Sequence, residues 1–508
     1  MDFRVILILI GLSSIFGYLI KERTKESLHM VQLEGYDPEH YLKWLSNNKK
    51  RAYSIKKEKM PIKKPLVMTD RAKRLFYANW VLNVLIITIL TVAVMTVISF
   101  LGSHLVVTLV IMGFFMVLAY YWQPIFMWIT TLIMRPIENS INMGFYKKAQ
   151  EKIKQREDLT VIGITGSFGK TSTKFIVGTI LSSKFNVLNT PESYNTPMGL
   201  SKVINNDLTD EHQVFVAEMG AKVLGEIREV AELAQPTIGI LTSIGPVHME
   251  TFKNIDNIMK TKYELIDELP TDGVAVFNYD NEYIKKLADK TFKEKMLYGL
   301  EDVEKLDLYA DEIEVSEQGS SFNLKDKAGN SIRCSTKLLG RHNIYNLLAG
   351  ACAAVVMGLS FEEISEGIKI VEPVEHRLNV IEAVNGVIII DDAFNSNPIG
   401  TKAALEVLGQ FKEGRKIVIT PGMIELGDME ESANREFGMN MAKVCDYVIL
   451  IGEKRTMPIY EGLISTGFNP SNIFRVHNLN EATAQLGKLT KPKDVVLFEN
   501  DLPDNYSE

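Results

Sequence analysis

The apolar positions of the chain follow two patterns, and the change between them falls near residue 157. Before it, three long apolar runs cover about residues 4–20, 80–101 and 104–122. A helix of about 20 apolar residues crosses the hydrocarbon part of a bilayer, so each run is predicted to be a membrane span. After it, short runs rich in β-branched residues alternate with segments whose apolar positions recur at the helical spacing. The pattern therefore predicts a membrane domain at residues 1–157, followed by an α/β portion.

The segment between the first two predicted spans, residues 21–78, is basic and includes "NNKKR" and "SIKKEKMPIKK". Loops rich in Lys and Arg stay in the cytoplasm, so three spans place the N-terminus outside and the chain after the third span inside. A cleaved signal peptide is the alternative for the first run. However, "MDFR" is not the basic start that such a peptide needs, and no small-residue cleavage site follows. Residues 122–134 stay apolar but contain Gln123 and Pro124, so they extend the third helix or lie along the interface.

The apolar runs after residue 158 end on polar residues or glycine, as in "TVIGITG", "GVIIIDDAF" and "DVVLFEND". Strands separated by helices of this size predict parallel sheets covered by helices on both faces. Ligands bind such sheets at the carboxyl ends of the strands, so the polar residues there are the first candidates for a site. A change of pattern at residues 371–386 divides this portion into a domain at 158–370 and a smaller one at 371–508.

Composition narrows the function classes. The net charge is −7, and no long basic stripe occurs in the C-terminal two thirds, so nucleic-acid binding is not expected. The three cysteines, Cys334, Cys352 and Cys445, lack the spacing of metal ligands. They are expected to be reduced thiols in a cytosolic environment.

The strongest local motif is "TGSFGKTSTK", which follows a predicted strand and opens a predicted helix. Backbone N–H groups of such a loop and the positive end of the helix bind phosphates. Lys170 would contact the β- and γ-phosphates of a nucleotide, and the Thr171 hydroxyl would bind Mg²⁺. The common pattern G-x-x-x-x-G-K-[ST] is not matched, because Ile164 stands five residues before Gly169, and a chance Gly-Lys-Thr in a turn is the alternative. The predicted nucleotide-binding residues of the loop are Gly166, Ser167, Gly169, Lys170, Thr171 and Ser172.

Further motifs follow in order: "VAEMGAKVLGEI", "TSIGPVHMETF", "MKTKYELID", "GRHNIYNLLAGACAAVVMGL", "HRLNVI", "IIDDAFNSNPIGTKAAL" and "GMIELGD". With T-G-x-x-G-K-T, this collinear set resembles the Mur ligases, which use ATP to join amino acids or dipeptides to a carboxylate. It is most similar to members that add D-alanyl-D-alanine to a muramoyl tripeptide, on "DDAFNSNP" and "MIELG". The resemblance implies a central P-loop ATPase domain, a C-terminal Rossmann-like domain, and ATP and Mg²⁺ as cofactors.

The resemblance implies catalytic and metal-binding residues beyond the phosphate loop. Glu218, at a predicted strand end, is a hard oxygen ligand that suits Mg²⁺. Lys262 would be carbamoylated, which replaces a cation by an anion that supports the metal or the acyl phosphate. Arg377 would lie on the γ-phosphate side, where closure of the two domains completes the site. The implied catalytic set is Lys170, His248, Lys262 and Arg377, and the metal set is Thr171, Glu218 and His248.

Other residues are implied to bind the nucleotide or the substrate. Asn346 would read the adenine edge, and Asp392 would hold the ribose. Both also fit the simpler roles of helix cap or turn residue. His248 would alternatively be a hydrogen-bonded structural residue and Lys262 a solvated helix lysine, and a Pro-flanked turn is the alternative at residue 195. The residues expected to line the substrate are Asn195, Asn395, Asn397 and Glu425.

Two departures from the family concern the substrates. Membrane runs and a basic loop occupy the place of the N-terminal domain with which soluble members grip the UDP part of their substrate. At the other end, "DVVLFENDLPDNYSE" stands where the D-alanyl-D-alanine-adding members have a strand followed by K-G-S-R, so Glu499, Asp501 and Asp504 reverse the local charge. Asn434 also stands where a His is expected. The resemblance therefore supports the ATP chemistry more strongly than any particular carboxylate or amine.

The sequence as a whole predicts an ATP-dependent amide-bond ligase, anchored in the cytoplasmic membrane of a bacterial cell with its catalytic domains in the cytoplasm. It is expected to act in peptidoglycan or other envelope synthesis on a small-molecule or lipid-linked carboxylate and an amino acid or dipeptide, beside other envelope proteins. Two alternatives stay open. A poly-amino-acid or capsule-type synthase, or a glycan-amidating ligase, would share the core, and a nucleotide-binding membrane scaffold would use the fold without catalysis.

Overall fold

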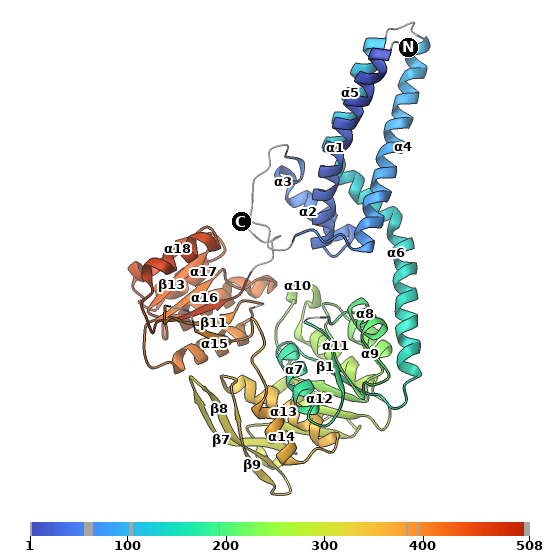
Figure 1. Ribbon diagram of the computed structural model, residues 1–508. Coiled ribbons are helices and arrows are strands. Elements are labelled where there is room, and N and C mark those ends of the chain that lie inside the picture. The colour runs from blue at the N-terminus through green and yellow to red at the C-terminus, as the bar shows by residue number, and fades with distance from the viewer. Residues whose placement is uncertain are drawn as a thin grey trace. The chain divides into compact units, whose positions relative to one another are not determined.

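The computed structural model describes residues 3–54, 65–100, 105–192, 194–382, 385–394 and 396–501 (Figure 1). They form two compact units, the first comprising the chain up to Met143 and the second comprising Gly144–Leu502. The strands of the second unit form two separate sheets. The α/β class that the sequence predicts for this portion is confirmed.

The first unit is helical. Its described helices are α1 (Phe3–Leu33), α2 (Pro38–Asn47), α3 (Lys49–Tyr53), α4 (Asp70–Phe100), α5 (Leu105–Tyr121) and the first part of α6 (Gln123–Lys154). Its core brings together Tyr41 of α2, Leu75 of α4 and Met127 of α6, all fully buried. Helix α2 begins at Pro38 because the Asp37 carboxylate accepts two backbone N–H groups of its first turn.

Buried polar side chains also join the helices of this unit. Arg74 of α4 donates two hydrogen bonds of 2.6 Å to the carboxylate of Glu138 of α6, which is buried. Gln123 of α6 donates to the hydroxyl of Thr24 of α1 at 2.8 Å, and both side chains are buried. Away from water such pairs fix the register of neighbouring helices, because separating them would leave polar groups unpaired.

One stretch of the described residues, Asp70–Leu90, is long and apolar enough to cross a bilayer by itself. A second qualifies only if Gly113–Tyr121 and Gln123–Lys154, which meet at 68°, count as one broken span. The predicted spans at 80–101 and 104–122 fall on α4 and α5, and the run at 4–20 falls on α1, mostly outside the described side chains. Three spans therefore stay a prediction. The boundary at 157 does so as well, because α6 crosses the division between the compact units.

The first sheet of the second unit has nine strands in the order β2-β3-β1-β4-β5-β6-β7-β8-β9. The strands from β2 to β7 pair in parallel, whereas β7, β8 and β9 pair antiparallel. The strands are β1 (Thr160–Thr165), β2 (Val187–Asn189), β3 (Val214–Glu218), β4 (Ile238–Leu241), β5 (Val274–Asn278), β6 (Lys295–Gly299), β7 (Leu308–Ser316), β8 (Gly319–Asp326) and β9 (Ser331–Thr336).

Helices cover both faces of this sheet, because successive residues of a strand point to opposite sides. In β1, Ile162 and Ile164 pack in one core cluster with α7, α13 and α14, whereas Val161 belongs to a second cluster with α8, α9, α11 and α12. The helices of this part are α7 (Lys170–Leu181), α8 (Pro197–Asn206), α9 (Glu226–Ala234), α10 (Met249–Phe252), α11 (Ile255–Asp267), α12 (Glu282–Ala288), α13 (Arg341–Val356) and α14 (Phe361–Lys369), with a short 3-10 turn at Val303–Lys305.

The second sheet has six strands in the order β10-β11-β15-β12-β13-β14, and only β10 runs antiparallel to its neighbour. Its faces are covered by α15, α16 and α17 on one side and by α18 on the other. The strands are β10 (Asn379–Glu382), β11 (Ile388–Asp392), β12 (Lys416–Thr420), β13 (Tyr447–Ile451), β14 (Ile473–Val476) and β15 (Val495–Glu499). The helices are α15 (Pro398–Gln410), α16 (Glu430–Met441), α17 (Met457–Ser465) and α18 (Leu479–Leu489), with 3-10 turns at Gly427–Met429 and Pro470–Asn472.

The apolar runs predict the strands that the helices cover, but they do not predict the antiparallel strands β7 to β9. Residues of β7 and β9 alternate between buried and more exposed positions along much of their length. A strand that is buried on one face only lacks the continuous apolar run by which the other strands are recognised.

Candidate active site

The phosphate loop joins the end of β1 to the start of α7, as the sequence predicts. Gly169 has φ of 76°, a left-handed conformation that glycine adopts without strain. A Cβ on Gly166 would lie 2.1 Å from the hydroxyl of Thr242, so glycine is required there by close approach. The loop is also fastened to the segment after β4, because Phe168 N–H donates to the Ser243 hydroxyl at 2.8 Å. The backbone of this loop is thus set before any ligand binds.

Two loop residues and one strand residue form the centre of the site. Lys170 Nζ donates to the carbonyl of Gly166 at 2.8 Å, and its burial lowers its pKa, opposed by the charge of Glu218. The Thr171 hydroxyl donates to Glu218 Oε2 at 2.9 Å. Glu218 is the last residue of β3 and is 1% exposed. A cation, a hydroxyl and a carboxylate therefore meet at the carboxyl end of the sheet.

Glu218 has two further partners. Asn195 Nδ2 donates to Glu218 Oε1 at 3.1 Å from the loop before α8, which brings a predicted substrate residue into contact with the predicted metal ligand. Lys174 Nζ lies 3.4 Å from Glu218 Oε2 and also donates to the carbonyl of Glu192. The sequence analysis did not select Lys174. Its only signal was the position four residues after Lys170, on the same helix face.

This cluster has the donor chemistry that Mg²⁺ and phosphates require. Mg²⁺ is commonly held by one or two protein oxygens with phosphates and water completing the shell, so Thr171 and Glu218 fit such an ion. Across the described ranges of the chain there is no group of three or more His, Cys, Asp or Glu side chains placed to hold a metal. His248, the third predicted metal ligand, makes a different contact.

His248 lies in the loop between β4 and α10, where it contacts Glu425 from the loop after β12. His248 Nδ1 and Glu425 Oε2 are 2.7 Å apart, and both residues have left-handed backbones, with φ of 48° and 63°. The hydrogen bond from His248, together with the charge of Lys222, lowers the pKa of the Glu425 carboxyl to about 2. The contact joins the first sheet to the second and holds the imidazole through Nδ1, which leaves the other ring nitrogen, Nε2, for a ligand.

We expect Glu425→Ala to lower the free energy of unfolding by about 1 kcal/mol at pH 7, because it removes a charged hydrogen bond. Since the folded pKa of Glu425 is depressed, this stabilisation is present above about pH 4.5 and is lost as the pH falls toward 2. Urea unfolding of wild type and variant at pH 7 and pH 4 would measure both effects. Glu431→Ala is the control, since that glutamate is exposed on α16. Equal losses in the two variants would contradict the expectation.

Lys262 is on α11 and is 2% exposed, so it is not the solvated helix lysine of the simpler interpretation. Burial and the charge of Lys170 lower its pKa to about 7. The described residues offer it no hydrogen bond or ion pair, and its ammonium lies 6.0 Å from the ring of Phe252. A buried lysine with this pKa is partly neutral at physiological pH, which makes it a nucleophile toward carbon dioxide.

The predicted adenine-reading residue, Asn346, lies on α13 against the phosphate-loop helix. Its Oδ1 accepts from the Thr173 hydroxyl at 3.2 Å, and its Nδ2 donates to Asn343 Oδ1 at 3.1 Å. A Cβ on Gly169 would lie 2.7 Å from Asn346 Oδ1. Asn346 therefore lies beside the phosphate loop, and its hydrogen bonds already give it a structural role. The sequence had left such a role open as an alternative to adenine binding. Burial lowers the pKa of the neighbouring His342 to about 4, so that imidazole is neutral.

The second sheet contributes Arg377 and Asp392. Arg377 lies in the linker before β10, with its guanidinium 4.1 Å from the centre of the Phe394 ring, and burial lowers its pKa. Asp392 ends β11, and its Oδ1 accepts the N–H of Leu378 at 3.2 Å. Asn397 caps α15 by accepting from two backbone N–H groups, so its substrate role stays a prediction. Asn395 lies outside the described residues.

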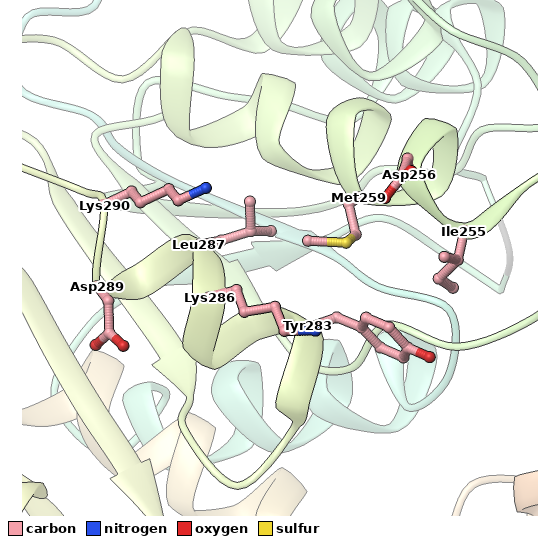
Figure 2. Close-up of a pocket in the computed structure, with 8 residues that line it drawn as sticks. All are labelled: Ile255, Asp256, Met259, Tyr283, Lys286, Leu287, Asp289 and Lys290. Carbon is pink, nitrogen blue, oxygen red and sulfur yellow. The ribbon is translucent and has the colours of Figure 1, made fainter.

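A separate surface cavity of about 500 Å³ lies between α11 and α12 (Figure 2). Its lining includes Tyr283, Lys286 and Lys290 of α12 and the segment after it, and Ile255 and Met259 of α11. None of the predicted nucleotide, metal or substrate residues lines this cavity. The candidate site is therefore the cluster around the phosphate loop and not this hollow.

Comparisons with known proteins agree with the motif series. A model of the Mur ligase middle domain matches residues 164–354, and a model of the Mur ligase, glutamate ligase domain matches residues 376–499. The UDP-N-acetylmuramoyl-tripeptide–D-alanyl-D-alanine ligase of Bacillus subtilis is 30% identical over 279 residues, which cover 55% of this chain and 59% of the relative. The Mycobacterium tuberculosis enzyme of that name is 30% identical over 360 residues, covering 67% of this chain and 70% of the relative.

Solved structures show the same similarity. A crystal structure of MurF from Acinetobacter baumannii has a TM-score of 0.65 at 27% identity, covering 72% of this chain and 78% of that one. The MurF ligase of Thermotoga maritima in complex with ADP has a TM-score of 0.63 at 26% identity, covering 71% of this chain and 80% of that one. The chain spans 59% to 66% of the length of the first curated relatives it matches.

Proposed function

The chain belongs to the Mur ligase family, and from this premise we propose that it is an ATP-dependent, ADP-forming ligase that joins an amine to a carboxylate. The observation that carries the proposal is the convergence of Lys170, Thr171 and Glu218 at the carboxyl end of the first sheet. ATP with Mg²⁺, when bound, would supply the phosphoryl group that converts the carboxylate into an acyl phosphate and leaves ADP, and the amine would then attack the acyl carbon and displace phosphate. The residues of the chain bind, orient and neutralise the reacting groups.

Each residue of the cluster has a defined task in this proposal. The loop N–H groups and Lys170 neutralise the β- and γ-phosphates, and Thr171 and Glu218 hold Mg²⁺. Asn195, hydrogen-bonded to Glu218, orients that carboxylate and faces the substrate. Lys262, as a carbamate, would place a negative charge beside the cations of the site. Asn346 and Asp392 bind the adenosine part, and Arg377 completes the γ-phosphate side.

The test is ADP release by the purified full chain with defined substrates. The first pair is UDP-N-acetylmuramoyl-tripeptide and D-alanyl-D-alanine, the substrates for which the relatives are named. A second series replaces the soluble carboxylate by a lipid-linked muramoyl peptide, because a helical unit with long apolar runs precedes the Mur ligase middle domain, which matches from residue 164. ADP release that requires both a carboxylate and an amine supports the proposal. Release that ignores both would contradict it.

Two alternatives give different results in the same assay. A poly-amino-acid synthase would add many residues to one acceptor, so the product mass would show a ladder where a single-addition ligase gives one step. A nucleotide-binding scaffold would bind ADP but release none from ATP under any substrate combination. We favour single addition, because the similarity to the relatives extends through both Mur ligase domains.

We further propose that the N-terminal unit attaches the enzyme to the cytoplasmic membrane of a bacterial cell, so that it works on envelope intermediates at the inner leaflet beside other envelope-building proteins. Three features support this: the apolar runs on α1, α4 and α5, the stretch Asp70–Leu90, and the basic segment 21–78. The proposal places the basic segment and both Mur ligase domains in the cytoplasm.

Single-cysteine labelling tests this topology. Cys334, Cys352 and Cys445 are buried, so the native background with a membrane-impermeant maleimide is expected to be low. We expect Ser103→Cys, between the second and third predicted spans, to be labelled in intact spheroplasts. Lys49→Cys, at an exposed position of the basic segment, should react only after permeabilisation. Labelling of Lys49→Cys in intact spheroplasts would contradict the topology, and recovery of the chain in the soluble fraction would contradict membrane attachment.

A further inference from the structure

A buried carboxyl group and a half-buried one end two neighbouring strands of the second sheet. The parallel register of β11 and β15 places Asp392 directly opposite Glu499, and both residues point to the same face of the sheet. Like charges directly opposite each other on neighbouring strands repel. The pair therefore requires a cation or a proton.

The guanidinium and imidazole groups near the pair act on Asp392 and on Asp391, not on Glu499. Arg377, in the linker above β11, is the positive charge that acts on Asp392. Asp391, the next carboxylate on β11, is paired with His376 Nδ1 at 2.7 Å. No ion pair reaches Glu499 from the described residues, although it is 1% exposed. The neighbouring strand β12 offers it no charged side chain, since that strand ends in Thr420.

The hydrogen bonds of Glu499 show where a proton would reside. Its Oε1 accepts from the hydroxyl of Ser396 at 2.7 Å. Its Oε2 is buried and accepts no hydrogen bond from the described residues, and the strand register places Asp392 opposite this residue. An O–H on Oε2 would satisfy this atom by donating to the Asp392 carboxylate. Burial and the neighbouring carboxyl raise the pKa of Glu499 well above its usual value, and burial raises that of Asp392 to about 6.

We infer that Glu499 is a positioning residue that holds a proton at neutral pH and donates it to Asp392, orienting that carboxylate toward the ribose of the nucleotide. This inference rests on the proposed function, in which Asp392 holds the ribose. A carboxyl donates to Asp392 only while it holds its proton, so this contact is lost as the pH rises through the pKa of Glu499.

The test compares Mg-ADP binding by the full chain, its Glu499→Gln variant and its Glu499→Leu variant, measured by titration calorimetry at pH 7 and pH 9. Gln keeps a donor toward Asp392 and does not titrate, whereas Leu keeps the bulk and removes the donor. We expect Glu499→Gln to bind within about twofold of wild type at pH 7, and Glu499→Leu about tenfold more weakly. As the pH rises through the raised pKa of Glu499, the wild type should lose affinity relative to Glu499→Gln, which does not titrate.

A second measurement does not depend on the nucleotide. A carboxyl whose folded pKa is raised stabilises the protein most below its unfolded pKa, and this stability is lost as the pH rises through the folded pKa. The unfolding midpoint of Glu499→Gln should therefore exceed that of the wild type by a margin that widens from pH 6 to pH 9. Identical pH profiles for wild type and Glu499→Gln would overturn the shared proton, and equal binding by the Gln and Leu variants would overturn the positioning role. If the wild type binds no Mg-ADP, the proposed function fails, and the midpoint comparison alone then supports or overturns the shared proton.

Discussion

Lys170→Ala is expected to reduce ADP formation by about a thousandfold, because it removes the cation that offsets the charge developing on the transferred phosphoryl group. Lys170 is held at the phosphate loop by the carbonyl of Gly166, and no other described lysine makes a hydrogen bond within that loop. Lys174, one turn on, is bound to Glu218 and to the carbonyl of Glu192, so it is not free to replace it. The loss should appear mainly in kcat, measured by coupled ADP release with saturating substrates.

The matched control is Lys184→Ala, which removes a lysine just beyond the C-terminal end of α7 that forms an exposed ion pair with Glu363. We expect it to change activity by less than about twofold, since exposed ion pairs contribute little. Far-ultraviolet circular dichroism would show that both variants are folded. Retention of a tenth or more of the activity by Lys170→Ala would contradict the assignment of Lys170 to the β- and γ-phosphates.

Lys262→Met is expected to abolish ligation and at the same time to stabilise the protein. Keeping an amine in this buried position costs stability, because burial lowers its pKa from 10.5 to about 7. The folded pKa is depressed, so this cost is absent above pH 10.5, grows as the pH falls toward 7 and is constant below it. In buffer free of carbon dioxide, removal of the amine should raise the free energy of unfolding at pH 7 by on the order of 3 kcal/mol.

The activity part of this prediction has its own control. Carbamate formation needs the neutral amine and carbon dioxide, so the wild type should lose activity in buffer freed of bicarbonate and recover it when bicarbonate is restored. Lys260→Met, a lysine exposed on the same helix, should respond to bicarbonate as the wild type does and should not gain stability. An active Lys262→Met, or a wild type indifferent to bicarbonate, would show that the lysine has no carbamate role.

The motif residues show which features of the site can be predicted from neighbouring residues alone. The phosphate loop, its preceding strand and its following helix are predictable because glycine conformation, strand periodicity and helix starts are local properties of the chain. Glu218 at the end of β3 and Asp392 at the end of β11 follow from the same reasoning, since ligands gather where strands end. The burial of Lys262 does not follow, because a lysine on a helix is usually solvated.

Contacts between segments that are distant in the sequence could be identified only in the folded chain. His248 and Glu425 are separated by 177 residues, and no pattern in either segment indicates that the two side chains meet. The contact of Asp392 with Glu499 depends on the order of strands in the second sheet, in which β15 is inserted between β11 and β12. From the sequence, Glu499 was recognised only as an acidic residue where the family resemblance implies a basic one. The order of the strands in the sheet shows that Glu499 lies opposite Asp392. The antiparallel strands β7 to β9 were missed because their burial is one-sided.

By itself, then, the sequence determined the α/β class, the two Mur ligase domains, the phosphate loop and the residue types available for chemistry, because periodicity and loop conformation are encoded over a few neighbouring residues. The tertiary structure decided which of those residues meet: Thr171 and Asn195 on Glu218, Glu425 on His248, and Glu499 on Asp392. It also decided the directions in which the pKa values of Lys262 and Glu499 shift, since a pKa depends on burial and on charges that come from other parts of the chain.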